Sequence, residues 1–276
     1  MHILLLGATG YLGRNIYESL KKEHEVYCVT RKGVTKDIDE ENKFNNYTQL
    51  ETVVNDIGFD WVINCVGAYD KGNDYKKIID ANYYFPFSIF NYTIEKKIRN
   101  YINIGTSLPN NVGIYSLTKN QLADIMRVIA SREEINFANL RLEMFYGGDF
   151  VGHKTFFDNL VAAMRENRTI DVTEGRQRRD IIRVEDVVSL IEHIIKSDYI
   201  SGYMDLDVGS GENAEMREIE NYLKELCKSK SLIRYGAIPI RENEPNTLAD
   251  VSWYDKVGFH LQYAYWEGLE DFYGSK

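Results

Sequence analysis

The sequence predicts an α/β fold in which a doubly wound parallel sheet is accompanied by a smaller C-terminal lobe. Three observations support this prediction. Short apolar runs alternate with longer segments of helical periodicity along the first half of the chain, as in a series of βαβ units. A glycine-rich turn directly follows the first apolar run. Hydrophobic residues make up 44% of the 276 positions, which is enough to bury the core of a large α/β domain.

The first half of the sequence supplies the expected sheet and the helices that cover it. The expected strands are Ile3–Leu6, Glu25–Thr30, Trp61–Val66, Tyr101–Ile104 and Phe137–Leu142. The expected helices are Gly10–Lys22, Thr48–Asn55, Tyr75–Lys97 and Tyr115–Arg132. Apolar residues three or four positions apart support the last of these helices, at Leu122, Ile125, Met126 and Ile129.

The pattern is looser after Gly147 and Gly148. The segments expected there are a helix at Phe156–Glu166, a helix at Val184–Lys196, a strand at Met204–Val208, a helix at Ala214–Lys228 and a loop at Ala237–Asp250. We therefore expect a first domain of residues 1–148, to which a helix near 184–197 returns. Residues 149–276 would form mainly a lobe that binds substrate.

Net charge and composition exclude several classes of function. With 33 basic and 42 acidic residues the formal net charge is −9, and no run of Lys and Arg could follow a nucleic-acid backbone. The apolar run before Gly7 is too short for a signal peptide, and no segment reaches the roughly 20 apolar residues of a membrane span. Cys28, Cys65 and Cys227 lack metal-ligand spacing. We expect a cytoplasmic protein with reduced thiols, no bound metal, and no nucleic-acid or membrane partner.

The turn GATGYLG, residues 7–13, has the glycine spacing of a dinucleotide-binding Rossmann fold. Gly7 permits a tight turn, Gly10 lets the backbone approach a pyrophosphate, and Gly13 lets helix and strand pack closely. The helix N-terminus then favours the anion. The expected cofactor contacts in this turn are Gly7, Thr9, Gly10, Tyr11, Leu12 and Gly13. The alternative is an ordinary strand–helix turn without a ligand.

The end of the second expected strand carries Thr30, Arg31 and Lys32, where an NAD-preferring site usually has an acidic residue. Two adjacent cations would attract a 2′-phosphate, and Arg31 could bind it with two N–H groups. These three residues predict NADPH (NADP⁺) as the cofactor. The alternative is that Arg31 and Lys32 are a solvated pair in a loop.

Tyr115 and Lys119 are four residues apart, so they share one face of the expected helix. A nearby ammonium group would favour the Tyr115 phenolate and lower the pKa of that phenol, as a general acid requires. Thr106 and Ser107 follow an apolar strand, at the carboxyl edge where open α/β sheets bind ligands. A hydroxyl group there could bind the same substrate oxygen as Tyr115.

At these residues the sequence resembles the extended short-chain dehydrogenase/reductase family, in its nucleotide-sugar epimerase/dehydratase/reductase branch. The resemblance covers nearly the whole chain. The motifs that carry it are GATGYLG, Asn64–Gly67, Asn82, Ile104–Ser107, the Tyr115/Lys119 pair, Arg141–Gly147, Arg179–Val187 and Asp207–Gly211. It implies a catalytic triad of Thr106, Tyr115 and Lys119.

The resemblance also implies the remaining site residues. The implied cofactor contacts are Cys65, Val66, Gly67, Asn82, Ile104, Tyr115, Lys119, Leu142 and Phe145. The implied substrate contacts are Thr106, Ser107, Leu108, His153, Lys154, Phe156 and Arg179. Alternatives stay open for four of them: a solvated loop pair at His153 and Lys154, a packing role for Phe156, and a carboxylate partner for Arg179.

Departures from the family pattern narrow the implied activity. Sugar-nucleotide 4,6-dehydratases of this family have Thr-Asp-Glu where this chain has Thr106-Ser107-Leu108, and epimerase-reductases have a Cys in place of Leu108. The apolar Leu108 cannot abstract a proton. We expect NADPH-dependent reduction of the 4-keto group of a nucleotide-activated deoxysugar, a precursor of cell-surface glycans. The alternatives are an NAD-dependent nucleotide-sugar 4-epimerase and a non-catalytic NADP(H)-binding sensor.

The helices expected at Tyr75–Lys97 and Tyr115–Arg132 have more apolar positions than one sheet-facing stripe requires. In the family the corresponding helices form a four-helix bundle with their symmetry mates, so the resemblance implies a homodimer. We expect Phe90 and Met126 to lie in that interface, where replacement of both by Glu would separate the subunits. The alternative is that another segment of the same chain covers these positions.

Overall fold

The structure, a computed structural model, describes residues 1–29, 43–44, 58–69, 74–148, 155–197 and 199–274. The chain divides into two compact units. The sheet unit comprises Met1–Arg141 and Leu190–Leu206, and the second unit comprises Leu142–Ser189 and Asp207–Lys276. Residues 142–148, which we expected in the first domain, lie in the second unit.

A seven-stranded sheet forms the centre of the sheet unit, and its strand order is β11-β6-β5-β4-β1-β2-β3. These strands are β1 (His2–Leu6), β2 (Glu25–Val29), β3 (Lys43–Phe44), β4 (Trp61–Asn64), β5 (Asn100–Ile104), β6 (Asn136–Leu142) and β11 (Tyr203–Val208). The five pairs from β3 to β6 are all parallel. The order reverses between β1 and β4, which is the place where open α/β sheets bind ligands. The predicted doubly wound sheet is confirmed.

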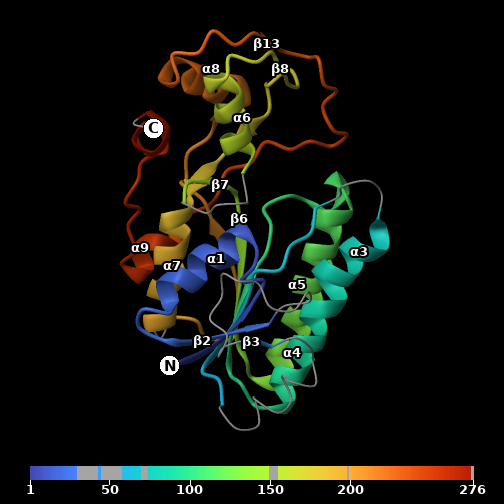
Figure 1. The fold of residues 1–276 in the computed structure, drawn as a ribbon. Coiled ribbons are helices and arrows are strands. Elements are labelled where there is room, and N and C mark those ends of the chain that lie inside the picture. The colour runs from blue at the N-terminus through green and yellow to red at the C-terminus, as the bar shows by residue number, and fades with distance from the viewer. Residues whose placement is uncertain (30–42, 45–57, 70–73, 149–154, 198, 275–276) are drawn as a thin grey trace. The chain divides into compact units, whose positions relative to one another are not determined.

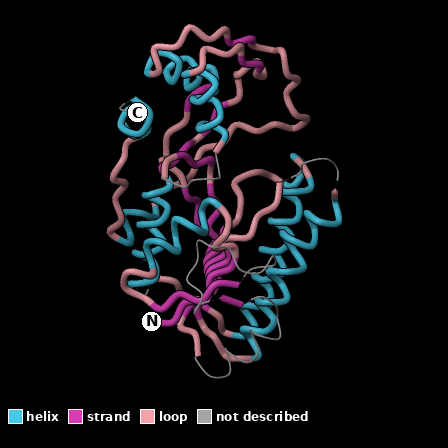
Figure 2. Tube along the Cα trace, viewed as in Figure 1, coloured by secondary structure: helices cyan, strands magenta, loops and turns pink. Residues whose placement is uncertain are grey.

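Helices cover both faces of this sheet (Figures 1 and 2). One face carries α1 (Tyr11–Leu20) and the part of α7 (Val184–Lys196) that belongs to the sheet unit. Lys196 at the end of α7 forms an ion pair of 2.7 Å with Glu23, which follows α1. The other face carries α3 (Tyr75–Ile79), the π-helical turn η2 (Asp80–Tyr84), α4 (Phe85–Glu95) and α5 (Ile114–Glu133); a 3₁₀ turn, η3 (Asn110–Val112), precedes α5.

One of these helices differs from the prediction. The single helix expected over Tyr75–Lys97 is interrupted by η2, because five residues there adopt π-helical hydrogen bonding between two α-helical segments. The helix expected at Thr48–Asn55 lies outside the described residues.

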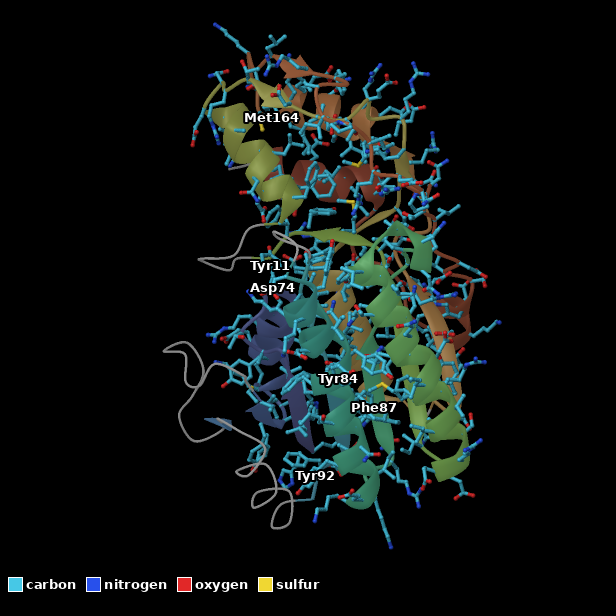
Figure 3. All side chains as sticks on the ribbon, turned by 90° about the vertical axis from the view of Figure 1, so that its right-hand side faces the viewer. Tyr11, Asp74, Tyr84, Phe87, Tyr92 and Met164 are labelled. Atoms are coloured by element: carbon cyan, nitrogen blue, oxygen red, sulfur yellow. The ribbon has the colours of Figure 1, made fainter. Side chains whose placement is uncertain are left out.

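The core of the sheet unit lies between the sheet and α4 and α5. Phe90 packs edge-on against Tyr101 and Phe137, with ring centroids 5.2 and 5.7 Å apart, and both Phe90 and Met126 are fully buried within the chain. These two residues therefore do not lie on an open face, contrary to our expectation. Tyr84, Ile125 and Val128 are exposed instead. Figure 3 looks onto this side of the molecule, with Tyr84 and Phe87 labelled.

The second unit has its own core. Short strands form three pairs: β7 (Met144–Tyr146) with β10 (Ile181–Arg183), β9 (Arg178–Arg179) with β12 (Ala214–Glu215), and β8 (Ile170–Asp171) with β13 (Ile233–Arg234). Its helices are α6 (Phe156–Arg165), the first part of α7, α8 (Met216–Leu226), α9 (Trp253–Val257), α10 (Tyr265–Leu269) and the π-helical turn η4 (Glu270–Gly274). Tyr146, Phe157 and Leu223 are among the residues buried in this core. Among the described residues, no helix is long and apolar enough to cross a bilayer.

Candidate active site

The turn between β1 and α1 is built so tightly that only glycine fits at two of its positions. Gly7 has φ +83°, and a Cβ there would lie 2.9 Å from the backbone carbon of Cys65. A Cβ at Gly13 would lie 2.2 Å from the carbonyl oxygen of Gly7. The first position brings β1 against the end of β4, and the second brings α1 against the turn.

The N-terminus of α1 fits an anionic group such as the pyrophosphate of a dinucleotide. Its N-cap residue, Gly10, has no side chain to cap the first turn, and that turn contains no acidic residue. Backbone N–H groups of a first helical turn have no intrahelical acceptor, and the helix dipole favours negative charge there. Thr9 and Leu12 belong to the same turn, and Leu12 is buried. Residues Thr30, Arg31 and Lys32, on which the choice of NADPH rests, lie outside the described residues.

In the loop after β4, side chains hold the backbone by hydrogen bonds at two alternate residues, Val66 and Ala68. The Val66 N–H donates to Asn64 Oδ1 at 3.1 Å, and the Val66 carbonyl accepts from Lys119 Nζ at 2.9 Å. Ala68 is held through both backbone groups by the side chain of Asn82, at 2.7 and 3.0 Å. The loop that carries Val66 and Gly67 is therefore attached to α5 and to η2.

Asn82 acts within the protein rather than at its surface. It is fully buried on the π-helical turn η2, and besides Ala68 its amide donates to Thr118 Oγ1 at 3.3 Å. Single π-helical turns inside α-helices are frequent at functional sites. The resemblance implied a cofactor contact for Asn82; in this structure its side chain links the loop after β4 to α5.

The three residues of the expected triad come from two elements of the sheet unit. Thr106 follows β5 and is 5% exposed, and its Oγ1 accepts from the Leu108 N–H at 3.2 Å. Helix α5 starts at Ile114, so Tyr115 lies in its first turn and Lys119 lies one turn later, with 2% of its surface exposed. Tyr115 is half-buried and hydrogen-bonds to Thr106. The structure thus brings Thr106 and Tyr115 together, while Lys119 holds Val66.

Burial dominates the acid–base state of these groups. It raises the pKa of Tyr115 well above its usual value; Tyr69 raises it further, and the hydrogen bond with Thr106 lowers it. Burial also lowers the pKa of Lys119 to about 8. We expected Lys119 to lower the pKa of Tyr115, and this expectation is wrong for the structure described here, because burial and Tyr69 raise that pKa and the Lys119 side chain donates to the Val66 carbonyl.

Tyr69 was not predicted as a site residue from the sequence. This residue follows the Asn64–Gly67 motif, and its ring stacks on that of Tyr115, with centroids 4.3 Å apart and an interplanar angle of 22°. The stack joins the loop after β4 to the first turn of α5, which are distant in the sequence, so no local pattern could predict it. The aromatic side chain two residues after Gly67 was the only available signal.

A row of three buried amide side chains that ends on an exposed carboxylate, which we call the amide ladder, was also missed. It consists of Asn64 on β4, Asn103 on β5, Asn139 on β6 and Asp205 on β11. Each Nδ2 donates to the next side-chain oxygen, at 2.8, 2.7 and 2.7 Å in that order. The three Asn residues are paired in register across the sheet and almost completely buried. The ladder thereby fixes the strand ends from which the site's loops start.

The other expected site residues occupy several environments. In the sheet unit, Ser107 and Leu108 are half-buried, Ile104 is buried, and burial raises the pKa of the Cys65 thiol to about 12. The second unit contains Leu142, Phe145, Phe156 and Arg179. His153 and Lys154 lie outside the described residues.

Two of the expected substrate contacts in the second unit differ in exposure. Phe156 is exposed at the start of α6. Arg179 is 4% exposed, pairs with Glu244, and donates to the carbonyl oxygens of Arg178 and Pro245. The ion pair with Glu244 corresponds to the alternative given above for Arg179, in which this residue pairs with a carboxylate of the protein.

Comparison with known sequences gives a consistent result. The sequence model of the NAD dependent epimerase/dehydratase family matches residues 3–209. CDP-abequose synthase of Salmonella muenchen is 25% identical over 282 residues, which are 97% of this chain and 95% of that protein. CDP-abequose synthase of Yersinia pseudotuberculosis is 27% identical over 215 residues, which are 72% of this chain and 74% of that protein.

Comparison with solved structures shows the same fold at lower identity. UDP-glucose 4-epimerase of Thermotoga maritima, solved with UDP-glucose, superposes with a TM-score of 0.85 at 16% identity, covering 99% of this chain and 97% of that one. UDP-glucuronic acid 4-epimerase of Bacillus cereus, solved with UDP-glucuronic acid and NAD, superposes with a TM-score of 0.83 at 20% identity, covering 99% and 98%.

Proposed function

The chain belongs to the NAD dependent epimerase/dehydratase family, and from this premise we propose that it reduces the 4-keto group of a nucleotide-activated deoxysugar with NADPH. Family membership carries the coarser part of this statement, a nicotinamide-dependent enzyme that modifies a sugar nucleotide. The hydrogen bond between Thr106, which follows β5, and Tyr115 on α5 supports the finer part, because it pairs a candidate acid with a group that orients it.

Each residue of the site has a distinct proposed role. When bound, the dinucleotide would lie with its pyrophosphate at the N-terminus of α1 and would supply the hydride. Tyr115 is protonated in the folded protein, because its pKa is raised, so its hydroxyl group can donate a proton to the ketone oxygen. Thr106 binds the Tyr115 hydroxyl group and orients it. Lys119 secures the loop after β4 through the Val66 carbonyl.

Two observations favour reduction of a ketone over elimination or proton abstraction from carbon. Neither Ser107 nor Leu108 offers a carboxylate or thiolate next to Thr106, and such a base is needed to remove a proton from the sugar. The similar full-length sequences carry the name of a synthase of a CDP-linked sugar. CDP-linked ketones are therefore the first substrates to test.

The test is oxidation of NADPH in the presence of 4-keto-6-deoxy sugars linked to CDP, GDP, dTDP and UDP. We expect loss of NADPH absorbance with at least one of these ketones, and a slower reaction with NADH. Failure to oxidise either cofactor with all four classes of ketone would refute the proposal. Interconversion of sugar epimers without added cofactor, by protein that retains NAD⁺ on purification, would replace reduction with epimerisation.

A further inference from the structure

Tyr69 has the largest exposed fraction of any aromatic side chain in the described part of the chain, 62%. Despite this exposure it lies almost parallel to the half-buried ring of Tyr115, at a centroid separation of 4.3 Å. Stacked aromatic pairs of this kind contribute roughly 0.5–1.5 kcal/mol beyond the area that they bury. An exposed ring that covers the candidate acid is therefore held there by a favourable contact.

The loop that carries Tyr69 is built to present it. Backbone groups of Val66 and Ala68 are hydrogen-bonded to Asn64, Lys119 and Asn82, as described above. Gly67 and Tyr69, the other two residues of this segment, face Tyr115. A Cβ at Gly67 would lie 3.9 Å from Tyr115 Cε2, and the Tyr69 ring stacks on the Tyr115 ring. The fixed residues alternate with those that contact Tyr115, so the loop supports the stack from buried anchors.

We propose that Tyr69 is a positioning residue, whose ring holds the Tyr115 ring in the plane in which the Tyr115 hydroxyl group meets Thr106. The proposal rests on the proposed function only for the consequence in turnover; the stack itself is a property of the folded chain. Without the Tyr69 ring, Tyr115 would be free to rotate about its side-chain torsions and would be open to water on one face. A misplacement of about 1 Å in a catalytic group can cost on the order of a hundredfold in rate.

The surroundings of Tyr115 fix the direction of the expected change in acidity. The polar groups that act on its acidity come from two elements: Tyr69 from the loop after β4 and Thr106 from the loop after β5. Lys119 on α5, which interacts with the Cys65 thiol, donates instead to the Val66 carbonyl. Burial and Tyr69 both raise the pKa of Tyr115. Removal of the Tyr69 side chain should therefore lower that pKa.

The test compares Tyr69→Ala, which removes the ring, with Tyr69→Phe, which keeps the ring and removes only the hydroxyl group. Tyr75→Ala is the matched control, because Tyr75 is 52% exposed at the start of α3 and is not a member of the Tyr69–Tyr115 stack. Both positions are exposed, so the three variants are expected to fold. Unfolding curves and titration of bound NADPH by fluorescence verify that the fold and the cofactor site are intact.

The first readout does not depend on activity. A 3-fluorotyrosine placed at position 115 reports its ring environment by its ¹⁹F resonance, and titration of that resonance gives the pKa of the phenol. We expect Tyr69→Ala to move the resonance strongly and lower the pKa, and Tyr75→Ala to change neither. Tyr69→Phe should move the resonance much less, because the ring stays in place, but should also lower the pKa, because Tyr69 raises it through its hydroxyl group. An unchanged resonance in Tyr69→Ala would overturn the proposal even if no substrate is reduced.

The second readout is turnover with the ketone that the protein reduces. We expect Tyr69→Ala to lower kcat by about ten- to a hundredfold with little change in KM. The basic limb of its kcat–pH profile should move to lower pH. Tyr69→Phe should stay within about threefold of the wild-type kcat at neutral pH, because the ring that positions Tyr115 is kept. Equal losses in Tyr69→Ala and Tyr69→Phe would assign the effect to the hydroxyl group and contradict the role of the ring.

Discussion

Tyr115 is half-buried, and burial is the first cause of its raised pKa. A phenol in this state keeps its proton across the physiological range, so the group is available as an acid and not as a base. Thr106 opposes the shift through its hydrogen bond. The acid therefore depends on two neighbours, one of which raises its pKa and one of which lowers it.

Tyr115→Phe tests the acid directly. We expect turnover of the 4-keto sugar to fall by about a hundredfold or more, because the general acid is lost while the ring still fills its place. Fluorescence titration of NADPH shows separately how far the lost hydroxyl group affects cofactor binding, since Tyr115 is also an implied cofactor contact. Tyr75→Phe is the matched control, and undiminished turnover in Tyr115→Phe would exclude Tyr115 as the proton donor.

Glu220 on α8 of the second unit is a second buried titratable residue. It is 2% exposed, and burial raises the pKa of its carboxyl group to about 7, against lowering by Tyr235 and Arg217. Between about pH 4.5 and 7 the folded protein holds this proton more tightly than the unfolded chain does. The resulting stabilisation is complete below the unfolded pKa and is lost as pH rises through the folded pKa.

Glu220→Gln should therefore remove a pH dependence of stability. We expect the variant to be more stable than the wild type at about pH 8, by on the order of 2 kcal/mol, and similar to it at about pH 5. Thermal melts of both proteins at the two pH values measure this difference. Parallel stability curves for the two proteins across this range would contradict it.

At the scale of elements, the amide ladder explains how four separate strands act as one support. The Nδ2 group of each Asn donates to the next side chain in the direction of β11. All three hydrogen bonds therefore point the same way, and the last one ends on the carboxylate of Asp205. Hydrogen bonds in such a chain polarise one another. An interruption in the middle of the ladder should cost more than one at its exposed end.

Asn103→Leu and Asp205→Ala test this gradient. Asn103→Leu leaves the Asn64 Nδ2 and the Asn139 Oδ1 buried without their partners, at about 1–3 kcal/mol each. Asp205 is exposed, so water can replace it and we expect a loss below about 1 kcal/mol. Urea unfolding measures both variants. A loss in Asp205→Ala as large as that in Asn103→Leu would show that the ladder is not graded.

The glycine turn gives a further prediction for an element. In Gly13→Ala the new methyl group would meet backbone atoms of Gly7 and Ala8, which cannot move aside as a side chain can. We expect NADPH affinity to fall by about tenfold or more, equivalent to about 1.4 kcal/mol, because the turn must shift. Gly113→Ala is the control, since nothing lies within 4 Å of its added Cβ. Fluorescence titration compares the two, and equal affinities would contradict the prediction.

The sequence predicted those elements whose signal is local and repeated. Runs such as Ile3–Leu6 and the spacing of Leu122 and Met126 gave β1 and α5 because each is long enough to show its period. The π-helical turn η2 was missed because one additional residue per turn barely alters an apolar pattern. The paired strands of the second unit were missed because two or three residues are too few to show alternation.

For the candidate site, the sequence predicted individual residues but not the contacts between them. The glycine turn, Thr106, Tyr115 and Lys119 were found because their residue types and spacing carry the chemistry. The ladder partners Asn103 and Asn139 each stand inside an apolar strand, which is an unusual place for an amide and was an available signal. The stack on Tyr115 and the acceptor of Lys119 are contacts between distant segments, and the burial of Tyr115, which comes first among the causes of its raised pKa, is likewise set by the tertiary fold.

At the scale of the whole molecule, the expected homodimer needs a different interface from the one first assigned. Phe90 and Met126 are core residues, so Glu at either position would unfold the protein rather than separate subunits. Ile125 and Val128 on α5 are exposed, at 37% and 47%, and Tyr84 at the end of η2 is exposed at 58%. These side chains offer the apolar surface that a four-helix interface would bury.

Sedimentation at micromolar concentration tests the dimer. We expect the wild type to have twice the chain mass of 32.0 kDa, and the double variant Ile125→Glu/Val128→Glu to have the single-chain mass. The paired control is Arg127→Glu/Arg132→Glu on the same helix, both exposed and polar, which changes charge without removing apolar surface. Sedimentation of the wild type as a 32.0 kDa species would refute the dimer.

The division of the chain has a consequence for synthesis on the ribosome. The polypeptide passes between the units three times, after Arg141, Ser189 and Leu206. When residues 1–141 have emerged, β6 is still the open edge of the sheet and Asn139 has no acceptor for its Nδ2, because Asp205 has not been translated. An unpaired edge strand invites association with other chains. At roughly 5–20 residues per second, the nascent sheet therefore waits several seconds for β11, an interval in which a chaperone would have its greatest effect.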